Sequence, residues 1–244
     1  MGSKKEWFGE WFNSKYYHIL YKHRDHEEAS LFIDNLCQHL QLKPGQKVLD
    51  LACGKGRHAI YLSKKGFDVI GLDLSEQNIA SAKKKESPAL KFYNHDMRQP
   101  WGKDEFDCTF NLFTSFGYFE DDTENQLAIN NVARSLKKGG RFILDFLNPY
   151  TVINHLVGEE IKVIDGLEFH IIKEFTDGFI IKKITFTDRE KSYYYQEKVK
   201  AIRRVHFLVY FENAGLSLVD LFGNYELKPY EAEKSERMIF YLKK

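Results

Sequence analysis

Long apolar runs and clustered cysteines are both missing from this sequence. No apolar run approaches the roughly 20 residues that span a bilayer, and the N-terminus carries no apolar signal core, so we expect neither membrane insertion nor secretion. Cys37, Cys53 and Cys108 lie far apart, without a C-x-x-C pair. This spacing argues against a zinc site or a disulfide framework and favours a reducing, cytoplasmic location.

An excess of charge of one sign is also missing. The 36 Lys and Arg residues nearly balance the 35 Asp and Glu residues, so no overall field attracts nucleic acid, and we expect no nucleic-acid partner. Hydrophobic residues are abundant, at 43% of the 244 residues, and 15% are aromatic. This composition predicts one α/β domain with an elaboration rather than two independent domains, and it leaves homo-oligomerisation open.

A predicted strand, a glycine turn and a helix follow one another between Lys47 and Leu62. Residues 47–51 form a short apolar run, residues 52–56 are mostly small, and the helical pattern starts at Arg57. The start of such a helix directs unpaired N–H groups and the positive end of its dipole at whatever lies over the turn. We therefore predict that an anionic or carboxylate-bearing ligand binds there.

Two classes of ligand use a turn of this kind. Gly54, Gly56 and Ala59 fit the dinucleotide pattern G-x-G-x-x-A. Asp50, however, places an acid inside the apolar strand, where a dinucleotide fold has a core residue, and a buried carboxylate needs a partner. As D-x-A-x-G-x-G, the stretch resembles motif I of the class I methyltransferases that use S-adenosylmethionine, with Ala52 in place of the first glycine. A plain strand-to-helix turn with a capping acid is the third interpretation.

Asp73 ends the next predicted strand, residues 68–72, and Ser75 follows as the cap of a helix. An acid about 20 residues beyond the glycine turn is placed to accept hydrogen bonds from both hydroxyls of a ribose. This position suits NAD and S-adenosylmethionine equally, so it predicts an adenosine ligand without choosing between them. A capping role for Asp73 is the alternative.

The resemblance to class I methyltransferases implies roles for further residues. It places Asp50 beneath the amino-acid end of the cofactor, and Asp96 at the adenine amino group. The other expected cofactor contacts are Ala52, Cys53, Gly54, Arg57, Leu74, Met97, Asn111 and Leu112, where Leu74 and Met97 enclose the adenine ring. Ser115, Phe116 and Tyr118 are the expected walls of the acceptor pocket. Ordinary packing, or for Asp96 a plain loop position, is the alternative for these residues.

The N-terminal residues 1–45 are helical in pattern and rich in large rings, at positions 7, 8, 11, 12, 16, 17 and 21. Such rings are commonly part of a core. The string YYHILYKHRD also resembles the lids that cover the cofactor in class I methyltransferases, which makes Tyr17, Tyr21 and Arg24 candidate contacts. His23 and His26 lie one turn apart, but without a carboxylate partner we expect no metal site.

Residues 90–94, 106–111 and 141–147 are expected to be strands. A helix over residues 123–136 is expected to be capped by Asp121 or Asp122 and ended by Gly139 and Gly140. Strands and helices thus alternate between residues 46 and 150, which predicts a doubly wound, mostly parallel sheet of seven strands. Its last two strands, residues 216–222 and 237–242, are expected to form an antiparallel closing hairpin, whereas a dinucleotide domain would end in a parallel strand. Residues 46–150 and 205–244 would form the cofactor domain. Residues 151–204 read as an antiparallel β insertion on the acceptor side, with hairpin signals at Asp165-Gly166 and Asp177-Gly178.

The leading hypothesis is an S-adenosylmethionine-dependent methyltransferase acting on a small-molecule acceptor, with an amine as one candidate. The β insertion resembles that of small bacterial N-methyltransferases. A sulfonium is already activated, so the lack of a Ser-His-Asp or metal constellation is compatible with catalysis, and no catalytic residue is assigned. An NAD-dependent oxidoreductase and a non-catalytic cofactor-binding module are the alternatives.

Overall fold

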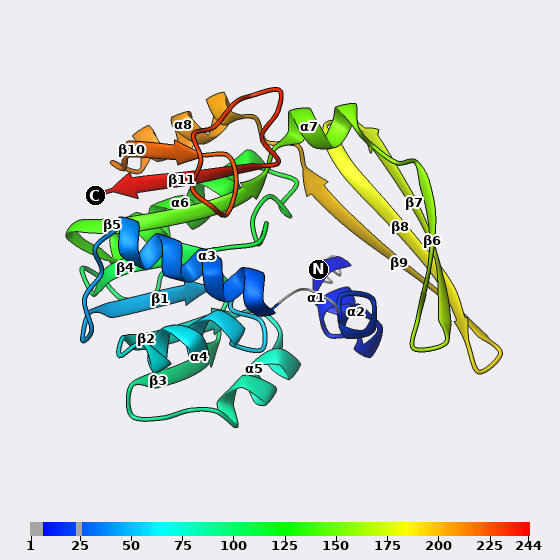
Figure 1. Cartoon of the computed structure of the whole chain (residues 1–244), viewed down its shortest axis with the longest axis horizontal. Coiled ribbons are helices and arrows are strands. Elements are labelled where there is room, and N and C mark those ends of the chain that lie inside the picture. The colour runs from blue at the N-terminus through cyan, green and yellow to red at the C-terminus, as the bar shows by residue number, and fades with distance from the viewer. Residues whose placement is uncertain (1–6, 23–25) are drawn as a thin grey trace, which may run out of the picture.

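The computed structural model describes residues 7–22 and 26–244, which are built around a seven-stranded sheet in the order β10-β11-β5-β4-β1-β2-β3 (Figure 1). The strands are β1 (Lys47–Leu51), β2 (Asp68–Asp73), β3 (Leu90–Asn94), β4 (Phe106–Asn111), β5 (Leu136–Leu147), β10 (Ser217–Phe222) and β11 (Arg237–Lys243). Strands β1 to β5 pair in parallel, and β11 is antiparallel to both of its neighbours. The predicted fold class is therefore confirmed, including the antiparallel closing strands.

Helices cover both faces of this sheet, as a doubly wound fold requires. One face carries α3 (His26–His39), α4 (Arg57–Lys64) and α5 (Glu76–Lys83), and the other carries α6 (Asp122–Ser135) and α8 (Arg204–Asn213). Phe32 and Leu36 of α3 are fully buried against the first face, whereas Leu31 on the same helix is 55% exposed. Among the described residues, no helix is long and apolar enough to cross a membrane.

The junction between α6 and β5 differs from the predicted one. Gly139 and Gly140 were expected to separate the helix from a strand beginning at Arg141, but β5 already begins at Leu136 and contains both glycines. The amide of Gly139 donates to the carbonyl of Lys244, and the amide of Lys244 donates to the carbonyl of Gly140, each at 3.0 Å. Leu136, where the strand begins, pairs with Phe106 of β4. Lys244, just after β11, and Phe106 therefore extend the strand N-terminally beyond Arg141.

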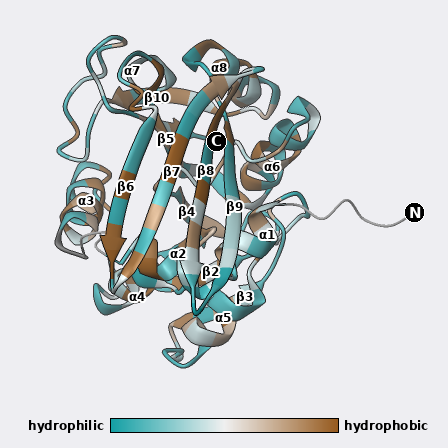
Figure 2. Cartoon of the chain, turned by 90° about the vertical axis from the view of Figure 1, so that its right-hand side faces the viewer, coloured by the Kyte–Doolittle hydropathy of each residue, from teal (hydrophilic) through white to brown (hydrophobic). Residues whose placement is uncertain are grey.

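The predicted insertion is an antiparallel sheet of four strands, β6 (Glu159–Ile164), β7 (Leu167–Thr176), β8 (Phe179–Asp188) and β9 (Lys191–Lys200), which α7 (Pro149–Asn154) joins to β5. Its hairpin turns place Asp165-Gly166, Asp177-Gly178 and Arg189-Glu190 at positive φ, as type I′ turns require. Figure 2 looks onto its outer face, where Ile161, Val163 and Ile172 are exposed.

Two short helices, α1 (Trp7–Phe12) and α2 (Lys15–Leu20), lie between the two sheets (Figure 1). Trp11, Tyr16 and Leu20 are buried against the inner face of the four-stranded sheet. The apolar side chains that receive them are Phe169, Ile171, Ile184 and Phe186. One side of the aromatic N-terminal segment is therefore part of a core that it shares with the insertion.

Candidate functional site

A cavity of about 480 Å³ lies at the carboxyl ends of β1, β2 and β4, and is closed by α1, α2 and β9. Because β1 lies between β2 and β4, this is the point where the strand order reverses. Open α/β sheets bind their ligands at such a switch point, in the crevice outside the strand ends. The fold therefore places the glycine turn after β1 in the floor of this cavity.

The two glycines of this turn serve different purposes. Gly54 has a φ of 57°, and no atom lies within 4 Å of the position that a Cβ would take, so its open side faces the cavity. A Cβ on Gly56 would instead lie 2.5 Å from the Phe92 ring, so this glycine permits close packing of α4 on the sheet. Ala52 has a φ of 60°, a conformation that glycine adopts more easily.

The carboxylate of Asp50 is fully buried beneath the turn, and it has the partner that the sequence required. Its Oδ2 accepts a hydrogen bond from the amide of Ala59 in the first turn of α4, at 3.0 Å. Burial raises the pKa of Asp50 to about 7, and the Asp73 charge adds to this, while the Ala59 amide and Arg57 oppose it. Asp50 thus ties the strand end to the helix start.

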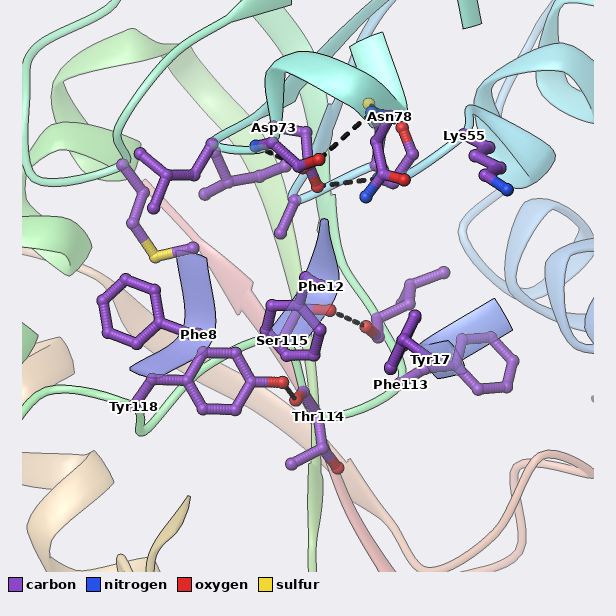
Figure 3. Close-up of a pocket in the computed structure, with 18 of the residues that line it drawn as sticks. Phe8, Phe12, Tyr17, Lys55, Asp73, Asn78, Phe113, Thr114, Ser115 and Tyr118 are labelled. Atoms are coloured by element: carbon purple, nitrogen blue, oxygen red, sulfur yellow. Dashed lines mark hydrogen bonds between the residues drawn. The ribbon is translucent and has the colours of Figure 1, made fainter. Parts of the chain in front are cut away.

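Asp73 holds the turn from the neighbouring strand (Figure 3). Its carboxylate accepts hydrogen bonds from the amides of Gly54 and Ser75, both at 2.8 Å, and from the side chain of Asn78. Burial raises the pKa of Asp73, although these hydrogen bonds oppose the shift. The Ser75 hydroxyl accepts from the amide of Asn78 at 3.1 Å and so caps α5, which leaves Asp73 directed towards the cavity.

A third acid, Asp96, lines the cavity after β3 and is held by a residue that was not predicted. Arg98 pairs with Asp96 at 2.6 Å and with Glu124 of α6 at 2.7 Å. Burial alone would raise the pKa of Asp96, but the hydrogen bonds and charge of Arg98 outweigh it and hold that pKa below its usual range. Asp96 is therefore a fixed, ionised hydrogen-bond acceptor.

The loop after β4 forms the opposite wall. Phe113 and Thr114 both have positive φ, at 59° and 57°, and the ring of Phe113 stacks on His58 with 4.9 Å between centroids. Tyr118 donates a hydrogen bond to the Thr114 carbonyl at 2.5 Å, and its ring packs edge-on against Trp7 of α1. The loop and the N-terminal helices thus enclose one aromatic space (Figure 3).

Most of the residues expected at the site do line this cavity. They are Tyr17, Tyr21, Asp50, Ala52, Cys53, Gly54, Arg57, Asp73, Leu74, Asp96, Met97, Leu112, Ser115 and Tyr118. Their expected contacts with a cofactor or an acceptor stay predictions. His23 and Arg24 fall outside the described residues, as does the side chain of His26.

Asn111 and Phe116 do not line the cavity. Asn111 is fully buried and donates from Nδ2 to the carbonyl of Leu51 at 2.9 Å, so it links the ends of β4 and β1. Phe116 is turned into the core, where its ring packs near that of Phe207 of α8. Asn and Phe are both compatible with a binding site. The strand that carries Asn111 and the loop that carries Phe116, however, direct these two side chains into the protein interior.

Several residues that line the cavity were not predicted, among them His18, Lys55, His58, Asn78, Phe113 and Glu197. Burial lowers the pKa of His18 to about 4, and nearby Lys55 adds to this, while its hydrogen bond with Asn78 opposes it. Asn78 could have been suspected from its place in the first turn after Ser75. Glu197 gave no signal, because a single acid in a strand of the insertion looks like a surface residue.

Comparisons with known proteins agree with this geometry. Residues 48–140 match a family model described as a methyltransferase domain. The dTDP-3-amino-3,4,6-trideoxy-alpha-D-glucopyranose N,N-dimethyltransferase of Streptomyces venezuelae is 30% identical over 120 residues, 49% of this chain and 50% of the relative. Curated relatives such as this one are matched over about half of their length.

Solved structures resemble almost the whole chain. An S-adenosylmethionine-dependent methyltransferase from Clostridium acetobutylicum has a TM-score of 0.79 at 23% identity, covering 93% of this chain and 95% of that one. The sugar N-methyltransferase KedS8 from Streptoalloteichus has a TM-score of 0.74 at 19% identity, covering 92% and 91%. At these identities the likeness establishes the fold. Residues 48–140 thus match a methyltransferase domain, and the chain as a whole has the fold of S-adenosylmethionine-dependent methyltransferases.

Proposed function

We propose that the protein binds S-adenosylmethionine in this cavity and transfers its methyl group to a small-molecule acceptor through an amine nitrogen. The observation that carries the proposal is the convergence of Asp50, Gly54, Asp73 and Asp96 at one end of a cavity whose other end is aromatic. The acidic end has hydrogen-bond acceptors for the adenosine and amino-acid parts of the cofactor. The aromatic end provides the apolar surroundings that a transferred methyl group needs.

The residues present fit the proposed cofactor. The open space over Gly54 leaves room for a ligand to approach the backbone, Asp73 is directed towards the cavity from the end of β2 as a ribose acceptor, and the ionised Asp96 can accept from an adenine amino group. Bound S-adenosylmethionine would supply an electrophilic methyl group on a sulfonium. The chain then has to position the acceptor and exclude water.

Residues 1–45 are proposed as a lid and residues 151–204 as the cover on the acceptor side. The described helices α1 and α2 support this, because they share a core with the insertion on one side and line the cavity on the other. Phe12 and Tyr17 of this segment meet edge-on, with 5.0 Å between ring centroids, beside the expected acceptor space. These rings would keep water from the reacting methyl group.

An amine acceptor is favoured by the amino-sugar N,N-dimethyltransferase that is 30% identical to half of this chain. An NAD-dependent oxidoreductase is less well supported, because β11 runs antiparallel where a dinucleotide domain ends in a parallel strand. The three cysteines are buried and free, which favours a reducing compartment such as the cytoplasm.

The proposal is tested in two steps. Calorimetry with S-adenosylmethionine, S-adenosylhomocysteine and NAD in parallel should give binding of the first two and none of NAD. A screen of amines and alcohols, read as formation of S-adenosylhomocysteine, should then find turnover with an amine. Tight binding of NAD without either S-adenosyl compound would overturn the proposal.

A further inference from the structure

One carboxylate lines the cavity from the insertion sheet. Glu197 lies on β9, whereas Asp50, Asp73 and Asp96 come from the ends of strands in the larger sheet or the loops that follow them. The side chain of Glu197 is 18% exposed. A carboxylate placed this deep keeps its charge only if it has partners, and it has them in three different elements.

These partners fix the orientation of Glu197. Its Oε1 accepts a hydrogen bond from the indole N–H of Trp11 in α1 at 2.7 Å. The hydroxyl of Tyr21, just after α2, lies 2.6 Å from Oε1 and 2.8 Å from Oε2. Lys182, paired with Glu197 across β8 and β9, lies 3.8 Å from Oε2 and donates to the Tyr21 hydroxyl at 2.5 Å. Glu197 is therefore held in place by donors around it.

In this arrangement the Glu197 carboxylate lies at the cavity surface, and the Lys182 ammonium group does not. Lys182 is outside the cavity lining, behind the carboxylate, and the Tyr21 hydroxyl takes the closest contact of its ammonium group. An ordinary structural ion pair would need only the two side chains, at a closer distance than 3.8 Å. Here the carboxylate is preorganised as an acceptor of hydrogen bonds from whatever occupies this end of the cavity.

We infer that Glu197 binds the amine of the methyl acceptor and receives the proton that this nitrogen loses. The inference rests on the function proposed above and names the residue that selects its acceptor. The nitrogen lone pair forms the N–C bond while the bond between carbon and sulfur breaks and its electron pair stays on sulfur. Before this step the protonated amine gives one proton to the Glu197 carboxylate, which passes it to water, so that the nitrogen lone pair is free to attack.

Trp11, Tyr21 and Lys182 are positioning residues in this scheme. They hold the carboxylate towards the cavity, where it can accept a hydrogen bond from an N–H group of the acceptor. Other titratable groups near this network are Tyr17, whose ring lies 4.9 Å from that of Tyr21, and Lys162, Lys173 and Glu160, whose charges act on Lys182. His18 and Lys22 of the N-terminal segment also line the cavity. The alternative is that the network only fastens α1 and α2 to the insertion sheet.

The test uses the full chain saturated with S-adenosylhomocysteine and three amines. They are dTDP-3-amino-3,4,6-trideoxy-α-D-glucopyranose, glucosamine and ethanolamine. Each is compared with the compound that has a hydroxyl in place of the amine, namely dTDP-4,6-dideoxy-α-D-glucopyranose, glucose and ethylene glycol. Calorimetry should show that at least one amine binds at least tenfold more tightly than its counterpart. Glu197→Gln should abolish this preference and leave the affinity for S-adenosylhomocysteine within twofold.

Turnover of that amine with S-adenosylmethionine provides the second measurement. We expect kcat/KM to fall at least 100-fold in Glu197→Gln and the acidic limb of the kcat profile to move to higher pH, because the nitrogen must then lose its proton to water. Glu197→Asp should recover part of the loss. Glu174→Gln is the matched control, because Glu174 pairs with Lys183 on the same sheet away from the cavity, and it should behave as wild type.

Trp11→Phe separates the two interpretations, since it removes a donor to Glu197 but keeps the carboxylate. If the network only fastens the helices, Trp11→Phe and Glu197→Gln will lower the melting temperature alike and neither will change the preference for the amine, which would overturn the inference. Wild-type amine binding and turnover in a folded Glu197→Gln would do the same. A wild-type protein that binds S-adenosylhomocysteine but neither binds nor methylates any amine would contradict the proposed amine acceptor. The role inferred for Glu197 would then be overturned as well.

Discussion

Arg237 at the start of β11 forms an ion pair with the fully buried Asp145 of β5, at 2.7 Å. The same carboxylate accepts a hydrogen bond from the amide of Phe113 at 2.7 Å, and Arg237 also donates to the hydroxyl of Thr114 at 2.8 Å. Phe113 and Thr114 are the two non-glycine residues of the loop after β4 that have positive φ, and both line the cavity. The pair therefore holds the loop in a conformation that costs free energy by itself.

Asp145→Asn should accordingly destabilise the protein by about 3–5 kcal/mol, because it leaves the Arg237 charge buried without its partner. Urea unfolding measures this change. Asp104→Asn, which removes an exposed pair with Lys244, is the control and should leave the unfolding midpoint close to that of the wild type. An Asp145→Asn protein as stable as the wild type would show that the loop does not depend on the pair.

Gly54→Val should abolish binding of S-adenosylmethionine and leave the fold largely intact, because the new side chain would extend into the cavity where no atom now lies within 4 Å of the Cβ position. The backbone strain at φ 57° needs its own control. Gly166→Val provides it, since Gly166 has a φ of 79° and open space around it, but belongs to a hairpin of the insertion. Undiminished affinity in a Gly54→Val protein with a wild-type circular-dichroism spectrum would contradict the assignment.

Asp73→Ala should weaken binding of S-adenosylmethionine by about 1.5–3 kcal/mol, the cost of losing hydrogen bonds to a charged group. Part of this loss would come from the glycine turn, because Asp73 also accepts from the amide of Gly54. Calorimetry gives the affinity, and Asp68→Ala at the other end of β2 is the control. If Asp73→Ala and Asp68→Ala bind S-adenosylmethionine with equal affinity, Asp73 only stabilises the glycine turn and does not contact the cofactor.

The pH dependence of stability should reveal Asp50. Its pKa in the folded protein is raised to about 7, so its contribution is fully present below pH 4 and is lost as the pH rises through 7. Asp50→Asn can still accept from Ala59 and has no such loss. Its stability relative to the wild type should therefore rise between pH 5 and pH 8, by about 2–3 kcal/mol, since most of the loss falls between pH 5 and 7 at about 1.36 kcal/mol per pH unit. A pH-independent difference in urea unfolding would show that Asp50 is ionised throughout.

The N-terminal helices should respond to the cofactor if they form a lid. We expect amide exchange in α1 and α2 to slow when S-adenosylhomocysteine is added, because their cavity side would then be covered by ligand. The strands β7 and β8, which pack on the other side of these helices, provide the internal reference and should change less. Equal exchange with and without ligand would identify α1 and α2 as permanently docked.

Local patterns were sufficient to locate the elements of the larger sheet. The bounds predicted for β1, β3 and β4 agree with the structure, and Asp121 and Ser75 cap their helices. These features depend on hydrophobic periodicity and on side chains that bind backbone amides within three residues, so neighbouring residues carry the whole signal. The start of β5 was missed because its first residues pair with Phe106 of β4 and with Lys244, both of which are distant in the sequence.

The sequence by itself determined the acids and glycines of the cofactor end, since Asp50, Gly54 and Asp73 lie at strand ends whose order follows from the alternating fold. Which residues line the opposite end of the cavity was decided only by the tertiary structure. Glu197 enters it because the insertion folds back over the strand ends, and Trp11 and Tyr21 orient it from a segment more than 170 positions earlier in the chain. Long-range packing of this kind produces no periodic pattern in the sequence, because each of these residues contacts a partner in a different element.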